Sequence, residues 1–125
     1  MASIFTSGII QNPGNISTLH VIITNPHPVD TQNVLFEMYT HATNSTQLYL
    51  QQLFELTPLN RAGYFQSFDS IFAHNSNFEL RAKVQSSAHS GGEIIITLVG
   101  FDANGIESLR IYDNDIDVSS RYGEL

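Results

Sequence analysis

The sequence predicts an all-β fold, a single antiparallel β-sandwich of jelly-roll or Ig-like type with about eight strands and an N-terminal extended arm. Three observations support this prediction. Segments of alternating apolar and polar residues recur roughly every 8 to 15 residues, and turn residues separate them. No segment has a convincing amphipathic helical pattern. Because parallel strands need crossover connections that are usually helical, the neighbouring strands are expected to be antiparallel.

The most apolar segment, Glu93–Phe101, is the expected centre of the sheet. Seven of its nine residues are apolar or Gly, and it ends at the turn sequence Asp102–Gly105. Such a segment is expected to be a strand buried on both faces, with other strands on either side. One face would carry Ile94, Ile96 and Leu98, and the other would carry Ile95, Val99 and Phe101.

The other expected strands are 16–25, 33–41, 47–59, 64–68, 78–84 and 106–112, followed by a short apolar tail at Ile116 and Val118. Segment 47–59 also fits a helical stripe. We interpret it as a strand because Thr57-Pro58 ends it and no helix cap precedes it. Residues 69–77 are expected to form a crossing loop that buries Ile71 and Phe72.

The N-terminus predicts an arm and hinge at residues 1–14, separate from a sandwich domain at residues 15–125. The arm is a short apolar stretch that ends at the chain break Pro13-Gly14. Such a strand can lie in its own sandwich, or it can lie in the sheet of a neighbouring subunit. In an extended chain, Ile4, Gly8 and Ile10 would share one side, with Phe5 and Ile9 on the other. The candidate assembly residues are therefore Ile4, Phe5, Gly8, Ile9 and Ile10.

The composition narrows the classes of partner. Lys and Arg total 5 against 12 Asp and Glu, which gives a net charge of −7. An acidic surface repels phosphate backbones, so nucleic acid is not an expected partner. No segment is apolar for the roughly 18 residues of a membrane span, so membrane insertion is not expected either. The first residues lack a basic start, so no signal peptide is expected. With no Cys, disulfides and thiolate metal sites are excluded.

A weak candidate metal site lies in the acidic run Asp113, Asp115 and Asp117. Counted from Asp113, the first, third, fifth and twelfth positions are acidic, as in a calcium-binding loop, and the twelfth is Glu124. Val118 stands where that motif has Gly, and the helices that flank such loops are missing. The five histidines have no spacing that fits a ligand pair on a helix. A solvated acidic turn is the favoured interpretation, and no metal or cofactor is expected.

No pattern specifies a catalytic reaction. There is no Gly-x-Ser-x-Gly turn for a nucleophile, and Gly91-Gly92 is too short for a phosphate-binding loop. Glu37, Glu55 and Glu79 are expected on outward strand faces, with nothing that sets the separation needed for glycoside hydrolysis. The protein is therefore not expected to be an enzyme.

Several aromatic residues are expected on the face opposite the core, where they can stack on sugars or contact a protein. The absence of Trp weakens the sugar interpretation. They are among Tyr39, Tyr49, Tyr64, Phe65 and Tyr112, and the usual role of such residues is ordinary packing.

The chain also resembles a family of small uncharacterised β-sandwich proteins of spore-forming Firmicutes, which are loosely similar to the subunits of endospore appendages. The resemblance rests on Phe78–Val84, on the strand and turn Ile95–Gly105, and on the closing Gly123-Glu124-Leu125. Thr24-Asn25 at a strand end and Leu56-Thr57-Pro58 are also similar. The chain departs from the family at Tyr122-Gly123, where His-Ser is more common, and it lacks the N-terminal cysteines that cross-link appendage subunits.

The resemblance implies a structural subunit that polymerises by lending its N-terminal strand to the next subunit, in a fibre at the spore surface or outside the cell. Its partner would be a further copy of itself, in a filament or a ring. Two alternatives remain open from the residues. One is a monomeric module that binds carbohydrate or protein through its aromatic face, and the other is a viral capsid or tail decoration protein.

Overall fold

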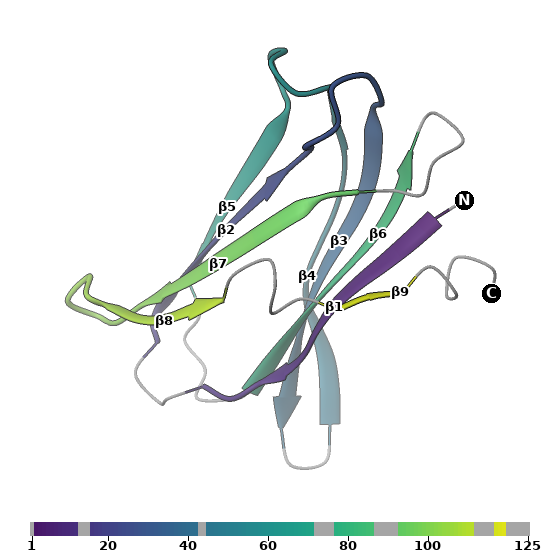
Figure 1. Cartoon of the computed structure of the whole chain (residues 1–125). Coiled ribbons are helices and arrows are strands. Elements are labelled where there is room, and N and C mark those ends of the chain that lie inside the picture. The colour runs from purple at the N-terminus through teal and green to yellow at the C-terminus, as the bar shows by residue number, and fades with distance from the viewer. Residues whose placement is uncertain are drawn as a thin grey trace.

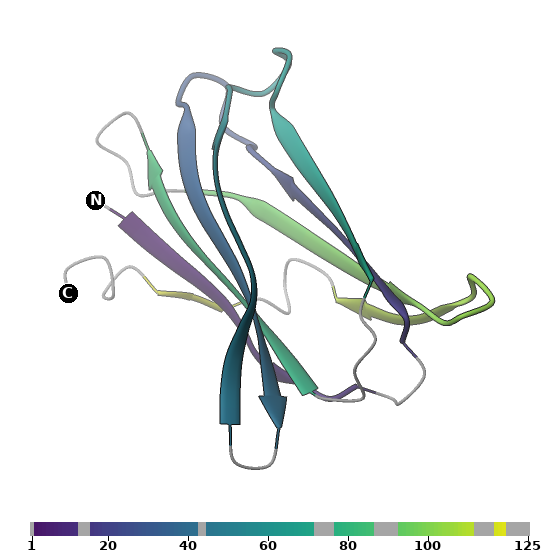
Figure 2. The same cartoon turned by 180° about the vertical axis from the view of Figure 1, so that it is seen from behind.

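The computed structural model describes residues 2–12, 16–42, 45–71, 77–86, 93–111 and 117–119. These residues form two antiparallel sheets that face each other as the layers of a sandwich (Figures 1 and 2). The five-stranded sheet has the order β4-β3-β6-β1-β9, and the four-stranded sheet has the order β5-β2-β7-β8. The strands are β1 (Ala2–Ile10), β2 (Thr18–Thr24), β3 (Gln32–Ala42), β4 (Ser45–Leu56), β5 (Phe65–Ile71), β6 (Asn77–Ser86), β7 (Ile95–Phe101), β8 (Glu107–Ile111) and β9 (Asp117–Ser119). The predicted all-β antiparallel sandwich is confirmed.

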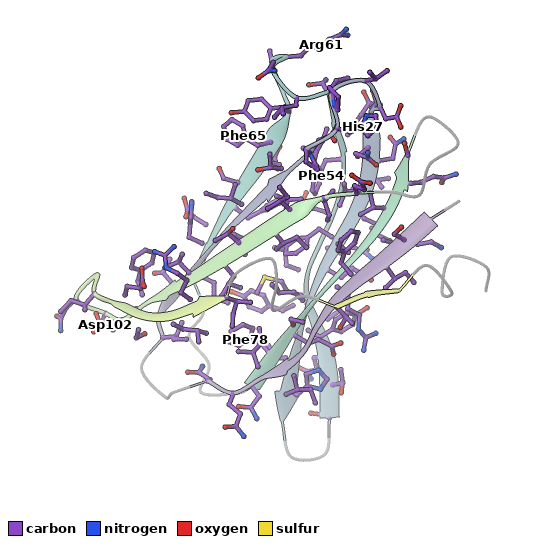
Figure 3. The ribbon with its side chains drawn as sticks, in the orientation of Figure 1. His27, Phe54, Arg61, Phe65, Phe78 and Asp102 are labelled. Atoms are coloured by element: carbon purple, nitrogen blue, oxygen red, sulfur yellow. The ribbon has the colours of Figure 1, made fainter. Side chains whose placement is uncertain are left out.

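The core lies between the inner faces of the two sheets and is made by residues that alternate along each strand. On β2, every second residue is buried, and β6 shows the same alternation from Leu80 onward. The ring of Phe68 on β5 stacks on Phe36 of β3 at a centroid distance of 5.3 Å, and lies 5.4 Å from Phe54 of β4. These three rings connect the sheets at the side where β4 and β5 are the edge strands. Figure 3 shows Phe54 among the side chains between the layers.

The ambiguous segment 47–59 is part of a strand, as predicted, because β4 pairs along its length with β3, from Gln32 opposite Leu56 to Ala42 opposite Ser45. The predicted crossing loop is corrected at both ends. Residues 69–71 continue β5 and pair with β2, and Asn77 begins β6. Residues 72–76, including Phe72, lie outside the described residues.

The prediction for Glu93–Phe101 is corrected in one respect. β7 begins at Ile95 and lies between β2 and β8, as expected of a central strand. Its inner face is buried, but its outer face is open at its start, where Ile95 is 41% exposed. The outer side becomes covered only toward Val99. The run of apolar residues therefore overstated the burial, since one face of this antiparallel sheet meets solvent.

β1 is a strand of the five-stranded sheet in the single chain. It lies between β6 and β9, and pairs with β6 from Ala2 opposite Gln85 to Ile10 opposite Phe78. The register shifts by one residue between Thr6 and Ile9, which marks a β-bulge.

The bulge overturns the predicted faces of the arm. One extra residue reverses the alternation, so Phe5 and Ile10 both point into the core and are 4% and 9% exposed. Ile4 is half-buried on the outer face, and Ile9 is 59% exposed. Gly8 is exposed at the bulge, where its φ of +65° favours Gly.

Asn25 closes one end of the sandwich from the inside. Its side chain is fully buried, and its Nδ2 donates to the carbonyls of Asp30 (2.8 Å) and Thr57 (2.9 Å). Its Oδ1 accepts the N–H of His27 at 2.9 Å. The side-chain amide of Asn25 thus connects the end of β2 to the start of β3 and the end of β4. It does so where prolines, which have no backbone N–H, cannot donate hydrogen bonds to a neighbouring strand.

The strand order resembles an Ig-like sandwich with one exchange. β2 pairs with β5 as strand B pairs with E in Ig-like domains, and β3 pairs with β4 and β6 as strand C pairs with C′ and F. In those domains the next strand along the chain, G, pairs with F. Here β7 pairs with β2 instead, and the N-terminal β1 fills the place beside β6.

Candidate functional site

The outer face of the five-stranded sheet carries the most concentrated set of charged and polar contacts in the described structure. The antiparallel register aligns outward side chains into rows across the strands. One row is polar, and the next carries Glu79 and Tyr39. The polar row contains Thr6 on β1, Arg81 on β6, Glu37 on β3 and Gln51 on β4.

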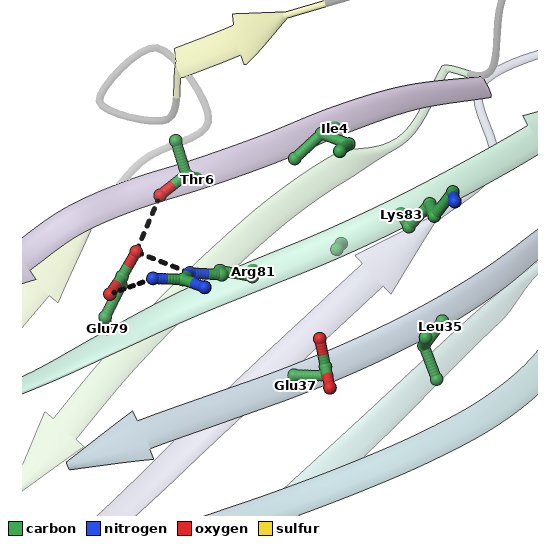
Figure 4. Close-up of a pocket in the computed structure, with 8 residues that line it drawn as sticks. Ile4, Thr6, Leu35, Glu37, Glu79, Arg81 and Lys83 are labelled. Atoms are coloured by element: carbon green, nitrogen blue, oxygen red, sulfur yellow. Dashed lines mark hydrogen bonds and ion pairs between the residues drawn. The ribbon is translucent and has the colours of Figure 1, made fainter. Parts of the chain in front are cut away.

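Glu79 is at the centre of this face. It points outward on β6 and yet is only 7% exposed. Its Oε2 accepts hydrogen bonds from Thr6 Oγ1 (3.1 Å) and Arg81 Nε (2.8 Å). Its Oε1 accepts from Arg81 Nη2 (3.1 Å) and lies 2.9 Å from His41 Nε2. Figure 4 shows the contacts with Thr6 and Arg81. Both carboxylate oxygens are therefore satisfied by side chains from three strands.

These contacts determine the charge state of Glu79. Burial alone would raise the pKa of Glu79, but the hydrogen bonds from Arg81, His41 and Thr6 and the charge of Arg81 outweigh it. The pKa is consequently lower than the ordinary value of 4.5. The hydrogen bond to Glu79 in turn raises the pKa of Arg81. The pair is ionised at neutral pH.

His41 extends the network to the edge of the sheet. Its Nδ1 lies 3.1 Å from Thr46 Oγ1 on β4. A neutral imidazole with its proton on Nε2 satisfies both contacts, donating to Glu79 and accepting from Thr46. The result is a chain of hydroxyl, imidazole and carboxylate, with the carboxylate also held by Arg81. The Arg81 guanidinium lies 4.7 Å from the ring centre of Tyr39, over one face of that ring.

Beside this network the surface is hollowed. The hollow has a volume of about 440 Å³ and lies over β6 between β1 and β3. Figure 4 shows Ile4 and Thr6 on one side and Leu35 and Glu37 on the other, with Lys83 at one end. The lining residues are Ile4, Thr6, Leu35, Glu37, Glu79, Arg81, Ala82 and Lys83. This lining combines two aliphatic side chains with two carboxylates and two cations. The hollow is therefore better suited to contact a surface with both apolar and charged groups than to bind a single charged group.

The candidate assembly residues do not form one surface. Phe5 and Ile10 lie in the core, whereas Ile4 lines the hollow on the outside. Gly8 and Ile9 are exposed at the bulge. One side chain holds this bulge against β6, and a second bonds within the bulge itself. Ser7 Oγ accepts the N–H of Leu80 at 2.9 Å, and Thr6 Oγ1 accepts the N–H of Gly8 at 3.1 Å.

Of the weak metal candidates, only Asp117 falls within the described residues. Its backbone pairs with Thr6 at the start of β9. Asp113 and Asp115 lie outside the described residues. Within the described ranges there is no cluster of three or more His, Asp or Glu side chains suited to a metal ion.

The aromatic residues do not form a continuous platform in the described part of the chain. Tyr64 and Phe65 pack edge to face at a centroid distance of 5.0 Å by β5. Tyr49 packs against the core, and Tyr39 lies beside Arg81 on the opposite sheet. Tyr112 lies outside the described residues.

The sequence did not reveal the network around Glu79. Alternation on β6 predicted that Glu79 points outward, which is correct, and outward residues are usually exposed. Thr6 and His41, which cover it, are 73 and 38 residues away along the chain. The neighbouring Arg81, two residues along the same face, was the one local signal.

Among the residues that the structure describes, no helix is long and apolar enough to cross a membrane. The search of protein-family models and the search of curated proteins found no match for the chain.

Proposed function

We propose that the protein is a structural, self-assembling subunit of an extracellular or spore-surface fibre, in which β1 is exchanged between neighbouring copies. One observation carries the proposal. β1 lies at the N-terminus and fills the place beside β6, where an Ig-like sandwich has its last strand. It is a self-contained element that a second copy could supply equally well.

The contacts of β1 support exchange because they are all made with segments far away in the sequence. Phe5 and Ile10 fill the core, and the ladder with β6 satisfies the backbone of both strands. The same contacts form whether β1 belongs to the same copy or to another. Residues 11–17 connect β1 to β2, and seven residues reach at most about 25 Å when extended.

Exchange of this kind is directional. If each copy gives β1 to the next and receives one from the previous copy, the contact is head to tail. Such contacts produce filaments, or rings when the rotation closes. Every open β6 edge would be covered within the assembly, and only the end of a filament would lack a partner. This is the arrangement that the resemblance to appendage subunits implies.

The alternative of a sugar-binding module receives less support. Arg81 covers one face of Tyr39, and Tyr64 packs against Phe65. Stacking on a sugar ring needs an open aromatic face.

A disulfide test distinguishes exchanged from unexchanged strands, because the native chain has no Cys. Ile4 and Lys83 are directly opposite each other on β1 and β6. Ile4→Cys protein and Lys83→Cys protein are mixed, unfolded, refolded together and oxidised. We expect a covalent dimer in which the cysteine at position 4 of one variant is bonded to the cysteine at position 83 of the other. Refolding separately before mixing is the control for slow exchange. Negative-stain electron microscopy of the unmodified protein should show filaments or rings.

Compact monomers in the micrographs, together with no disulfide between co-refolded variants, would exclude strand exchange. In that case β1 would belong to its own chain only.

A further inference from the structure

A cluster of buried polar side chains lies at the end of the sandwich where β3 begins and β6 ends. Asp30 is 5% exposed, Gln32 is fully buried and Ser86 is 7% exposed. Gln32 and Ser86 are directly opposite each other on β3 and β6, and both follow the inward alternation of their strands. Polar side chains are rarely buried this deeply unless hydrogen bonds satisfy them.

The side-chain amide of Gln32 is an exception to this rule. Neither its Oε1 nor its Nε2 has a hydrogen-bond partner in the part of the chain that the structure describes. Burial of an unsatisfied amide lowers the stability of a fold. Packing alone therefore gives no reason for a glutamine at this position, where the next inward residue of β3 is Val34.

Ser86, across from Gln32, carries an oriented hydroxyl group. Its Oγ donates a hydrogen bond to Oδ2 of Asp30 at 3.0 Å. The Nε2 of His27, in the β2–β3 connection (Figure 3), lies 3.6 Å from the same oxygen. The Nδ1 of His27 accepts the backbone N–H groups of Val29 and Asp30, so a neutral His27 has its proton on Nε2, next to Asp30. A carboxylate in this position can act as general base for the hydroxyl of Ser86.

The hydroxyl of Ser86 is within reach of the amide of Gln32. The Cβ atoms of directly opposite residues in an antiparallel pair are about 4.5 to 5.5 Å apart. The Oγ of Ser86 and the Cδ of Gln32 both extend into this interval, so side-chain rotation alone can bring the two atoms into contact. We propose that Ser86 and Gln32 form an intramolecular ester bond that cross-links β6 to β3.

The reaction is an acyl transfer within the chain. Ser86 Oγ gives its proton to the Asp30 carboxylate and attacks Cδ of Gln32. The Oγ–Cδ bond forms, the Cδ–Nε2 bond breaks, and the proton on Asp30 passes to the departing nitrogen. One molecule of ammonia leaves, and the atoms balance without any further reactant.

Two physical effects favour the ester over the separate side chains. The Nε2 group, which has no partner among the described residues, is released from the interior to water as ammonia. The ammonia is then diluted in the solvent, which opposes the reverse reaction. The burial of Gln32 and Ser86 also keeps water away from the ester, which protects it from hydrolysis.

The proposal does not depend on the exchange of β1. β3 and β6 pair within one copy whichever copy supplies β1, and the proposed bond lies between these two strands. The cross-link would keep β6, the strand that receives β1, covalently attached to the rest of its sheet.

The intact mass of the purified full chain tests the proposal directly. We expect it to be lower than the mass of the sequence by one molecule of ammonia, after correction for any removal of Met1. Ser86→Ala protein should have the full mass of its sequence, because it lacks the nucleophile. Ser3→Ala is the matched control. Ser3 is also buried, at 4%, on the strand next to β6, and this variant should still lose ammonia.

Peptide mapping locates the bond. Trypsin cleaves after Lys and Arg, so Gln32 falls in the peptide 1–61 and Ser86 in the peptide 84–110. These two peptides should stay joined after complete digestion, and mild alkali, which hydrolyses esters much faster than amides, should separate them. Loss of ammonia from Asn104-Gly105 as a cyclic imide would lower the mass equally but would not join the peptides.

Two further variants test the chemistry. Asp30→Asn removes the general base, so we expect at least about tenfold less cross-linked chain than in the unmodified protein at equal times after synthesis. Ser86→Thr keeps a hydroxyl on the same strand and should still form the cross-link. Circular dichroism verifies that each variant is folded.

An intact mass equal to that of the sequence would overturn the proposal, and internal water would then be the partner of Gln32. A loss of ammonia that persists in Ser86→Ala protein would overturn it as well. Neither result bears on strand exchange, which the co-refolding of Ile4→Cys and Lys83→Cys proteins decides separately.

Discussion

At the scale of single residues, the most informative side chain is Glu79. It points away from the core, and it is nevertheless buried by polar partners from β1, β3 and β6. A buried carboxylate is stable only when its oxygens are satisfied and its charge is compensated. Thr6 and His41 provide hydrogen bonds, and Arg81 provides the charge. Glu79 therefore connects three strands through side chains as well as through the backbone ladder.

Replacing this carboxylate should destabilise the protein in a pH-dependent way. The folded-state pKa of Glu79 lies below 4.5, so its stabilising effect is fully present above that pH and is lost as pH falls through the folded-state pKa. We expect Glu79→Gln to lower the free energy of unfolding by roughly 1 to 3 kcal/mol at pH 7. The loss should become smaller in acid. Urea unfolding followed by circular dichroism from pH 7 to pH 3 measures both effects.

Glu107→Gln is the matched control. Glu107 also bonds an arginine, Arg110, and its pKa is also lowered by that bond, but the pair lies at the surface. Exposed ion pairs contribute little to stability, so this variant should behave like the native protein. An equal effect of the two substitutions at all pH values would show that burial of Glu79 has no role.

At the scale of elements, β1 is defined by its bulge. Alternation along an unbroken strand placed Ile4 with Ile10, and that interpretation was wrong because one additional residue at Ser7–Gly8 reverses the faces. The hydroxyls of Thr6 and Ser7 replace ladder contacts at the bulge, and Gly8 takes the left-handed conformation. The bulge thus allows both Phe5 and Ile10 to reach the core.

Substitution of Gly8 should measure the energetic contribution of this conformation. A Cβ on Gly8 would meet no atom within 4 Å, so only the φ of +65° opposes a side chain. We expect Gly8→Ala to lower the free energy of unfolding by about 1 to 2 kcal/mol. Thermal unfolding measures the change.

Gly105→Ala is the corresponding control in the β7–β8 turn, since Gly105 has a φ of +77° and equally open surroundings. Both substitutions should lower the free energy of unfolding by similar amounts. Only Gly8→Ala should weaken the exchange of β1 between copies. If Gly8→Ala is as stable as the native protein, the bulge does not require the left-handed conformation.

At the scale of the whole molecule, the two sheets depend on a strand that comes from the N-terminus. β1 supplies two core side chains and covers one edge of β6. Burial of an aliphatic or aromatic side chain contributes about 1.5 to 3 kcal/mol. A domain of this size has a net stability of only about 5 to 15 kcal/mol. The domain boundary expected at residue 14 therefore separates segments that share one core in the single chain.

Removal of β1 should consequently destabilise the sandwich. We expect a chain that starts at Asn15 to unfold at a lower temperature than the full chain, and to bind dye that reports exposed apolar surface. A synthetic peptide of residues 1–13 added in trans should restore the unfolding temperature. A peptide with Phe5→Ser should not, since Phe5 fills the core. A truncated chain with unchanged stability would contradict the role assigned to β1.

The sequence by itself determined the class of the fold and the position of most strands, because burial of one sheet face imposes a two-residue period that is visible locally. Thr57-Pro58 and the prolines after Asn25 likewise predicted where strands end, since proline has no N–H for the ladder. Only the tertiary structure decided that β1 lies beside β6 and that Glu79 is buried. These features depend on pairing between residues tens of positions apart, and on a bulge that reverses the alternation, so no local pattern in the chain could specify them.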